Sequence, residues 1–272
     1  MKFIFGFSLL FAVTSAIPRQ LVVPVKDAGV GNSRIISGTP AVRGEVPFQV
    51  LNEPILPQGI GFCGGSLISS HWVLTAAHCA SGASSNTITL GTLSSLGDDP
   101  DAVVLHTTSH IVHENFNSIV LWNDVALIDL VTDVQFTNSF QLNVIKSIPL
   151  GSGFIEPGTY VEVSGWGRTS DSANWGSPSL NIVNLDTISK EECKLSFGNA
   201  IIDSTLCCKG HPEHNSCKGD SGGPLFAYDG GRPYHVGVIS FVHTTGCSVG
   251  KPSGYARTSY FIPWIESHTG PL

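Results

Sequence analysis

The stretch Cys217-Lys218-Gly219-Asp220-Ser221-Gly222-Gly223-Pro224 places one serine among glycines and directly after an aspartate. A serine hydroxyl is a weak nucleophile near neutral pH and needs an adjacent base to become reactive. Glycines beside it let backbone N–H groups approach a ligand closely, because they carry no Cβ. A glycine-rich run is also typical of a flexible turn, so the rest of the sequence has to decide between the two interpretations.

Two earlier stretches supply what a serine nucleophile needs. An imidazole can take up and return a proton near neutral pH, and His78 lies in Leu74-Thr75-Ala76-Ala77-His78-Cys79. A carboxylate can hold that imidazole in one tautomer, and Asp124 lies in Asn123-Asp124-Val125-Ala126-Leu127-Ile128. Taken singly, His78 is one of ten histidines and Asp124 could cap a turn. The order histidine, aspartate, serine and the flanking residues favour a catalytic interpretation.

These three stretches together resemble the chymotrypsin-like serine peptidases of the S1 family, from Ile35 onward. The further matching stretches are Ile35-Ile36-Ser37-Gly38, Cys63-Gly64-Gly65-Ser66-Leu67-Ile68, Ser164-Gly165-Trp166-Gly167 and Trp264-Ile265. The resemblance implies an all-β fold of two antiparallel six-stranded Greek-key β-barrels with a C-terminal helix. It also implies a serine endopeptidase in which His78, Asp124 and Ser221 act through an acyl-enzyme.

Local patterns agree with an all-β chain. Thirty glycines and sixteen prolines predict many turns, and short β-rich runs alternate with turn signals. Two segments are predicted to be helical, residues 189–195 and a C-terminal segment around Pro263. A composition break near residues 140–157 is expected to separate two halves. The β-rich runs are Thr87-Ile88-Thr89-Leu90, Ala102-Val103-Val104-Leu105, Tyr160-Val161-Glu162-Val163 and His235-Val236-Gly237-Val238-Ile239.

The N-terminus has the features of a secretory signal. Lys2 precedes an apolar run over residues 3–13, and Thr14-Ser15-Ala16 offers small residues for cleavage. A membrane anchor is the alternative, but the run is too short to span a bilayer. We therefore expect residues 1–16 to be a signal peptide, residues 17–34 a pro-segment and residues 35–272 the peptidase domain of a secreted protein, which could work in a digestive lumen.

The resemblance implies activation by cleavage between Arg34 and Ile35 by a trypsin-like protease. The new α-amino group of Ile35 would then pair with Asp220, and this pair would order the oxyanion loop and the pocket. By the same resemblance, the N–H groups of Gly219 and Ser221 form the oxyanion hole. Asp220 could instead be an ordinary turn residue.

Seven cysteines in a secreted chain should be mostly paired. Spacing alone cannot select a pairing, because six cysteines already allow 15. The resemblance implies Cys63–Cys79, Cys193–Cys207 and Cys217–Cys247. Cys208 is left over, either as a buried free thiol or as a competitor of Cys207.

Charge and composition limit which classes of partner are expected. The formal net charge is −7, and removing residues 1–34 removes four basic residues and one acidic residue, which leaves −10. This argues against nucleic acid and anionic membranes as partners. We expect protein or peptide substrates, proteinaceous inhibitors and a monomer, with no cofactor and no metal. An acidic cluster at Asp98, Asp99 and Asp101 lies where some family members bind calcium, but a solvated acidic loop is favoured.

The resemblance places the primary specificity pocket at Asn215, Ser240, Val242 and Ser253. Trypsin-like members carry Asp at the position of Asn215, so cleavage after Arg or Lys is not expected. Val242 stands where many chymotrypsins have glycine and should narrow the pocket, as in elastases. The run Ser240-Phe241-Val242-His243-Thr244-Thr245-Gly246-Cys247 resembles arthropod chymotrypsins and brachyurins. Some of those carry an acidic residue near Ser253, and its absence argues against collagen as a substrate.

Two other interpretations remain at this stage. A catalytically inactive binding homologue would use the same scaffold, although such proteins usually lose a member of the triad. A regulatory protease of a cascade would normally carry a cysteine-rich domain before the catalytic one. Neither feature is present in this sequence.

Overall fold

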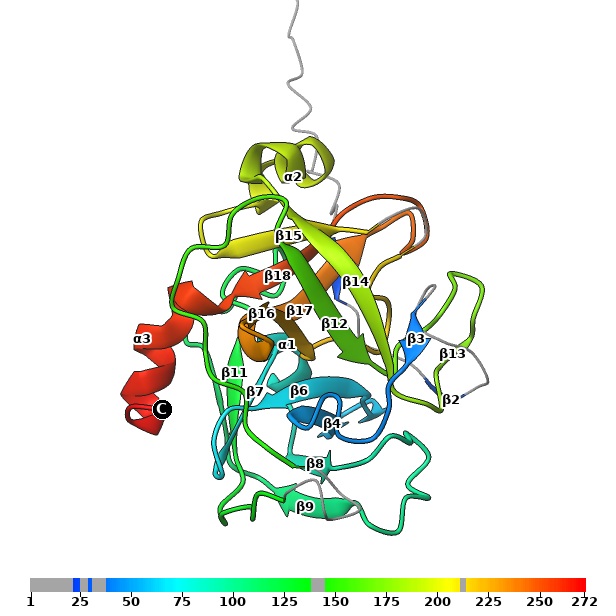
Figure 1. Cartoon of the computed structure of the whole chain (residues 1–272), viewed down its shortest axis with the longest axis vertical. Coiled ribbons are helices and arrows are strands. Elements are labelled where there is room, and N and C mark those ends of the chain that lie inside the picture. Colours follow the sequence, from blue (N-terminus) through cyan, green and yellow to red (C-terminus); the bar gives the residue numbers. More distant parts are fainter. Residues whose placement is uncertain (1–21, 25–28, 31–37, 138–144, 211–213) are drawn as a thin grey trace, which may run out of the picture.

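The computed structural model describes residues 22–24, 29–30, 38–137, 145–210 and 214–272 (Figure 1). The predicted signal peptide, the Arg34–Ile35 bond and part of the predicted break at 140–157 lie outside these residues. The described chain forms two large β-sheets, one above the other in the view of Figure 1, with few helices. The predicted all-β class is therefore confirmed.

The first sheet comes from the N-terminal half of the chain, and its ladders are antiparallel in the order β10-β11-β7-β6-β4-β8-β9, with β5 paired to β4. Its strands are β4 (Gln49–Leu56), β5 (Gly59–Ile60), β6 (Cys63–Leu67), β7 (Trp72–Thr75), β8 (Ser85–Leu90), β9 (Val103–Thr107), β10 (His110–Val112) and β11 (Ala126–Asp129). Only Thr108 and Ser109 separate β9 from β10, and there the chain leaves β8 and joins β11. The two ends of the strand order, β9 and β10, are thus consecutive in the chain, and the sheet is barrel-like as predicted.

The second sheet comes from the C-terminal half and closes on itself. Strand β17 pairs with both β16 and β18, so the path β17-β16-β12-β14-β15-β18 forms a six-stranded barrel. Two short strands, β1 and β3, add to β17 and β14. The strands are β1 (Val22–Pro24), β3 (Thr39–Pro40), β12 (Tyr160–Gly165), β14 (Asn181–Ile188), β15 (Thr205–Lys209), β16 (Pro224–Asp229), β17 (Arg232–His243) and β18 (Ser253–Arg257).

The remaining elements are short. Strands β2 (Gly29–Val30) and β13 (Trp175–Gly176) form a separate parallel pair. Helix α1 (Ala77–Ala80) lies between the two sheets, α2 (Lys190–Phe197) and the 3₁₀ turn η1 (Gly198–Ala200) lie at one end, and α3 (Thr258–Thr269) runs along one side (Figure 1). The Ser189 hydroxyl caps α2 by accepting from the Glu192 N–H. Both predicted helical segments are thus confirmed.

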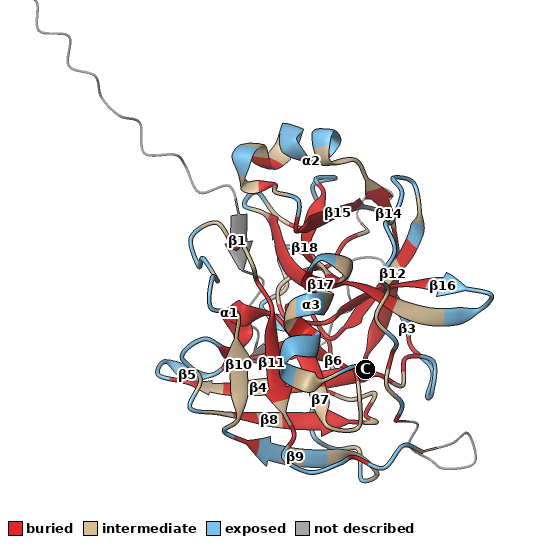
Figure 2. Ribbon diagram, turned by 90° about the vertical axis from the view of Figure 1, so that its left-hand side faces the viewer, coloured by how far each residue is buried: buried red, intermediate tan, exposed pale blue. Residues whose placement is uncertain are grey.

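The two halves share a buried interface. One hydrophobic cluster joins Leu74, Val125 and Leu127 of the first half to Val238 and Ile265 of the second. Figure 2 shows buried residues concentrated in the strands, with exposed residues gathered on α2 and β9. Burial of apolar surface therefore fixes how the halves meet, and it is at this meeting that the predicted site residues lie.

His235 is a polar connection in the same interface. Its ring nitrogens lie 2.7 Å from the Thr258 hydroxyl and 3.0 Å from the Ser66 hydroxyl, so the ring joins strands β17 and β6. The side chain is fully buried, and this burial lowers the pKa of His235 to about 3. The native protein thus holds this imidazole neutral.

We predict that His235 makes the protein acid-sensitive. In the unfolded chain His235 is protonated below its ordinary pKa of about 6.5, whereas in the native protein it stays neutral until about pH 3. The free energy of unfolding therefore decreases as the pH falls from about 6.5 toward 3. The loss should reach about 5 kcal/mol. Chemical denaturation at several pH values gives the free energy of unfolding as a function of pH. This free energy should depend less steeply on pH in His235→Gln, whereas replacement of the exposed His106 by Gln should leave the dependence unchanged. Equal slopes for both variants would contradict the assignment.

Candidate active site

Ser221 lies in the loop that leads from Cys217 into β16. The loop is held by both halves, because the Gly64 N–H donates to the Ser221 carbonyl at 2.7 Å and the Gly222 N–H donates to the Ile239 carbonyl at 2.8 Å. Ser221 itself is buried. Its hydroxyl is therefore presented from a fixed backbone rather than from a mobile glycine-rich turn.

His78 is positioned by helix α1, directly after strand β7. The Cys63–Cys79 disulfide joins this helix to β6. The His78 Nε2 atom lies 2.8 Å from the Ser221 Oγ atom, although 143 residues separate the two in sequence. This is hydrogen-bond distance, and it brings a base to the hydroxyl.

Asp124 holds the other side of the His78 ring. Its Oδ2 atom lies 2.7 Å from His78 Nδ1, and its Oδ1 atom accepts the His78 backbone N–H at 2.9 Å. Asp124 is fully buried. Since an ionised carboxylate can only accept, the ring proton belongs on Nδ1, which leaves Nε2 free to accept the proton of the Ser221 hydroxyl.

Ser240 also contacts the aspartate. The resemblance predicts that Ser240 lines the specificity pocket, and in the structure its hydroxyl donates to Asp124 Oδ2 at 2.5 Å. The aspartate therefore accepts three hydrogen bonds in a dry setting, which fixes its orientation. Sequence alone gave no signal for this contact, because 116 residues separate Ser240 from Asp124.

The predicted oxyanion donors lie at the start of the same loop. Gly219 has a φ of +101°, a conformation that favours glycine. Among the described residues, the N–H groups of Gly219 and Ser221 donate to no acceptor, whereas the neighbouring Asp220 N–H donates to the Cys217 carbonyl at 3.0 Å. Two donors are thus left for a ligand oxygen beside the Ser221 hydroxyl.

Asp220 points away from the cleft into the protein. Its carboxylate accepts the Gly167 N–H at 2.7 Å and the Cys217 N–H at 2.8 Å. A Cβ on Gly165 or Gly167 would collide with this carboxylate, so both glycines make room for it. Burial raises the pKa of Asp220 to about 7 despite these two donors. A buried carboxyl of this kind needs a cation to be stable when ionised.

The other pocket residues predicted from sequence lie together near Cys217–Cys247. Asn215 donates its amide N–H groups to the carbonyls of Lys251 at 3.1 Å and Cys247 at 3.4 Å. Val242 is buried against that disulfide. The Ser253 hydroxyl lies 2.8 Å from the Tyr255 hydroxyl, a partner that sequence reasoning missed. None of these side chains carries a charge.

The disulfides of the structure are Cys63–Cys79, Cys193–Cys207 and Cys217–Cys247. Cys208 is a free thiol in the core of the second barrel. Burial raises the pKa of the Cys208 thiol well above its ordinary value, so the thiolate is disfavoured. Cys208 is therefore a packing residue.

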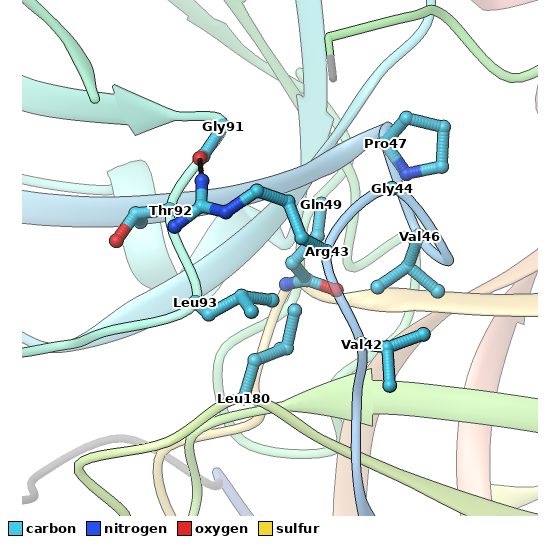
Figure 3. A pocket seen from close by; sticks show the side chains of 10 residues that line it. All are labelled: Val42, Arg43, Gly44, Val46, Pro47, Gln49, Gly91, Thr92, Leu93 and Leu180. Atoms are coloured by element: carbon cyan, nitrogen blue, oxygen red, sulfur yellow. Dashed lines mark hydrogen bonds between the residues drawn. The ribbon is translucent and has the colours of Figure 1, made fainter. Parts of the chain in front are cut away.

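The acidic loop is paired with a cation from elsewhere in the chain. Arg43 donates to the Asp99 carboxylate at 2.7 Å and to the Gly91 carbonyl at 2.9 Å, and Figure 3 shows the Arg43 side chain extending to Gly91. This pairing holds the pKa of Asp99 below its ordinary value although burial opposes it. Asp98, Asp99 and Asp101 do not converge as a group of three metal-binding side chains. Among the described residues the one such group is Asp171, Cys217 and Cys247, and both of its cysteines are in a disulfide.

The chain is similar to known proteins over most of its length. The family model described as Trypsin matches residues 35–265. Brachyurin of Leptuca pugilator is 37% identical over 236 residues, covering 87% of this chain and 99% of the relative. Collagenase of Hypoderma lineatum is 34% identical over 273 residues, covering 99% of both chains. A solved structure titled HL collagenase, 33% identical, has a TM-score of 0.77 and covers 88% of this chain and 100% of its own.

No helix among the described residues is both long enough and apolar enough to cross a bilayer.

Proposed function

Because the chain belongs to the trypsin family of serine endopeptidases, we propose that Ser221, His78 and Asp124 are its catalytic triad. The observation that carries this proposal is the continuous chain of contacts from Asp124 Oδ2 through both nitrogens of His78 to Ser221 Oγ. The substrates are peptides or proteins. The proposal assigns each of the three residues one step of peptide-bond hydrolysis.

In acylation, the Ser221 oxygen attacks the substrate carbonyl carbon while its proton passes to His78 Nε2. Asp124 stabilises the imidazolium that forms. The carbonyl oxygen becomes negative and accepts hydrogen bonds from the N–H groups of Gly219 and Ser221. When the C–N bond breaks, His78 returns the proton to the leaving amine. Water then attacks the acyl-enzyme by the same route, and the acid product and the Ser221 hydroxyl are released.

We further propose that the protein is a secreted precursor. Residues 1–16 act as a signal peptide and residues 17–34 as a pro-segment that a trypsin-like protease removes by cutting after Arg34. The start of the family match at Ile35 supports this boundary. The buried Asp220 supports it as well: among the described residues its carboxylate meets two N–H donors and no cation, and the α-amino group released at Ile35 would supply one.

For specificity, we propose a non-tryptic enzyme that prefers a small or apolar residue before the scissile bond. The support is the uncharged set of Asn215, Val242 and Ser253, in which the Asn215 amide is already bonded to two backbone carbonyls. Two of the similar proteins are named collagenase and brachyurin. We do not propose collagen cleavage for this chain, because some broad-specificity members carry an acidic residue near the position of Ser253 and this chain lacks it.

One experiment tests this function directly. The chain is treated with trypsin, and the trypsin is then inhibited. One sample is incubated with a fluorophosphonate, and another with peptides that differ only in the residue before the scissile bond. We expect labelling of Ser221 only after trypsin treatment and the highest kcat/KM for small apolar residues. A strong preference for Arg would reject the proposed specificity, and no labelling after activation would favour an inactive binding protein.

We predict that cleavage at Arg34 changes how stability depends on pH. In the uncut chain the pKa of Asp220 is raised to about 7, so stability is greatest below the ordinary aspartate pKa and is lost as pH rises from about 4 to 7. The Ile35 cation should offset this cost in the cut chain until it loses its proton above about pH 8. Thermal unfolding should therefore separate the cut and uncut forms by about 4 kcal/mol near pH 7.

The protein for this measurement carries Ser221→Ala, so that neither form digests itself. In the same background Asp220→Asn cannot ionise and should remove the pH-dependent gap between the forms. A gap that persists in Asp220→Asn, or no gap in the parent, would show that Ile35 does not pair with Asp220.

A further inference from the structure

The chain upstream of the family match contributes a strand to the second sheet. Strand β1 pairs antiparallel with the end of β17, in the register Val22 with His243, Val23 with Val242 and Pro24 with Phe241. These residues belong to the segment that we propose is removed on activation. An element of the pro-segment thus lies on the catalytic barrel.

The edge that β1 occupies lies beside the catalytic triad. Ser240, the next residue of β17, donates to Asp124. Strand β18 covers the opposite edge of β17 as far as Phe241. The ladder between β17 and β16 ends at Val238, next to the Ser221 loop. Among the described residues, β1 is therefore the only strand on this edge of the last residues of β17, and such an edge can pair with an extended peptide.

The sequence of β1 suits this edge. Proline lacks an N–H and is tolerated in a strand only where no ladder bond is needed. In an antiparallel pair, hydrogen-bonded and non-hydrogen-bonded positions alternate. If Pro24–Phe241 is a non-bonded position, Val23–Val242 is the position where both residues exchange hydrogen bonds. Val23 is thus the residue whose backbone matters most for docking.

A second contact continues the same path. Strand β2 pairs with β13 in the loop that follows Gly167 (Figure 1). That loop begins beside the nucleophile, because the Gly167 N–H donates to Asp220 and the Arg168 N–H donates to the Lys218 carbonyl at 2.7 Å. The described parts of the pro-segment therefore pair with two elements, β17 and β13, and both belong to stretches of chain that reach contacts next to Ser221.

We propose that Val22–Pro24 docks on β17 as a substrate-like strand and so blocks the site of the uncut chain. This inference rests on the proposed function and extends it to a substrate class. The enzyme would accordingly accept extended peptides with proline opposite Phe241 and an apolar β-branched residue opposite Val242, as in β1.

The docking is tested first in the full, uncut chain carrying Ser221→Ala. Hydrogen exchange at residues 241–243 is compared between this protein, a Val23→Pro variant and a Pro24→Ala variant. Val23→Pro removes an N–H at the bonded position and should speed exchange at least about ten-fold. Pro24→Ala is the matched control and should leave exchange slow. Equal exchange in all three proteins would overturn the docking.

A peptide of residues 20–27 provides an independent test. It should bind the trypsin-cut Ser221→Ala protein, and it should raise the KM but not lower the kcat of the cut wild-type enzyme. A peptide of scrambled order and a peptide with Val23→Pro should bind at least about ten-fold more weakly. Binding no better than that of the scrambled peptide would overturn the proposal.

The two proposals fail in different ways. Protected exchange and peptide binding in a cut protein without hydrolytic activity would keep the docking and reject the catalytic function. Hydrolytic activity together with fast hydrogen exchange in β17 and no peptide binding would support the catalytic function and reject the docking.

Discussion

Replacing Ser221 by alanine should lower kcat by about 10⁶-fold in the trypsin-cut enzyme. The hydroxyl is the atom that forms the acyl-enzyme, and His78 Nε2 lies 2.8 Å away to take its proton. Alanine leaves the Gly219 and Ser221 N–H donors in place, so the residual rate should come from transition-state hydrogen bonds alone. Hydrolysis of a peptide ester and fluorophosphonate labelling would measure the loss.

The matched control for this prediction is Ser172→Ala. Ser172 is exposed and its hydroxyl contacts only the Ser170 hydroxyl among the described residues, at 3.1 Å. Its replacement should leave kcat and labelling unchanged. Covalent labelling that persists in Ser221→Ala would show that another group is the nucleophile.

The contacts of the triad follow from sequence only through resemblance. Local motifs identify His78, Asp124 and Ser221, but 46 residues separate His78 from Asp124 and 143 separate it from Ser221. No periodicity connects positions so far apart. The packing of two half-structures brings them together, and Leu74 and Val238 in one cluster are part of that packing.

Side-chain direction is what the sequence could not supply. The contact of the Ser240 hydroxyl with Asp124 was not predicted, because successive strand residues point to opposite faces and the choice of face depends on the whole barrel. The partners of Asn215 and Ser253 depend in the same way on the backbone of distant loops.

Element boundaries show a similar limit. Pro263 lies well inside α3, although proline favours the first turn of a helix. Pro263 is exposed, so water can satisfy the carbonyl that its missing N–H leaves unpaired. Phe261 and Ile265 on the opposite face are fully buried and hold the helix against the first half. Burial here outweighs the local preference of proline.

Asp124→Asn should lower kcat by about 10⁴-fold at neutral pH while leaving the fold intact. An asparagine amide can donate to His78 Nδ1, which moves the ring proton to Nε2. That nitrogen would then donate to the Ser221 hydroxyl instead of accepting its proton. The carboxylate also accepts from the His78 N–H and from Ser240, so an amide loses acceptor capacity at a buried position.

Steady-state hydrolysis of a peptide ester by the cut enzyme measures this effect, and thermal unfolding shows that the variant is folded. Ser240→Ala separates the charge of Asp124 from the hydrogen bond that orients it, because the variant removes one hydrogen bond to Asp124 but keeps the carboxylate. It should lower kcat by about ten-fold. Asp229→Asn, at an exposed position, should change nothing. A folded Asp124→Asn enzyme within ten-fold of the parent would mean that the carboxylate does not set the tautomer of His78, and Ser221 would then need another base.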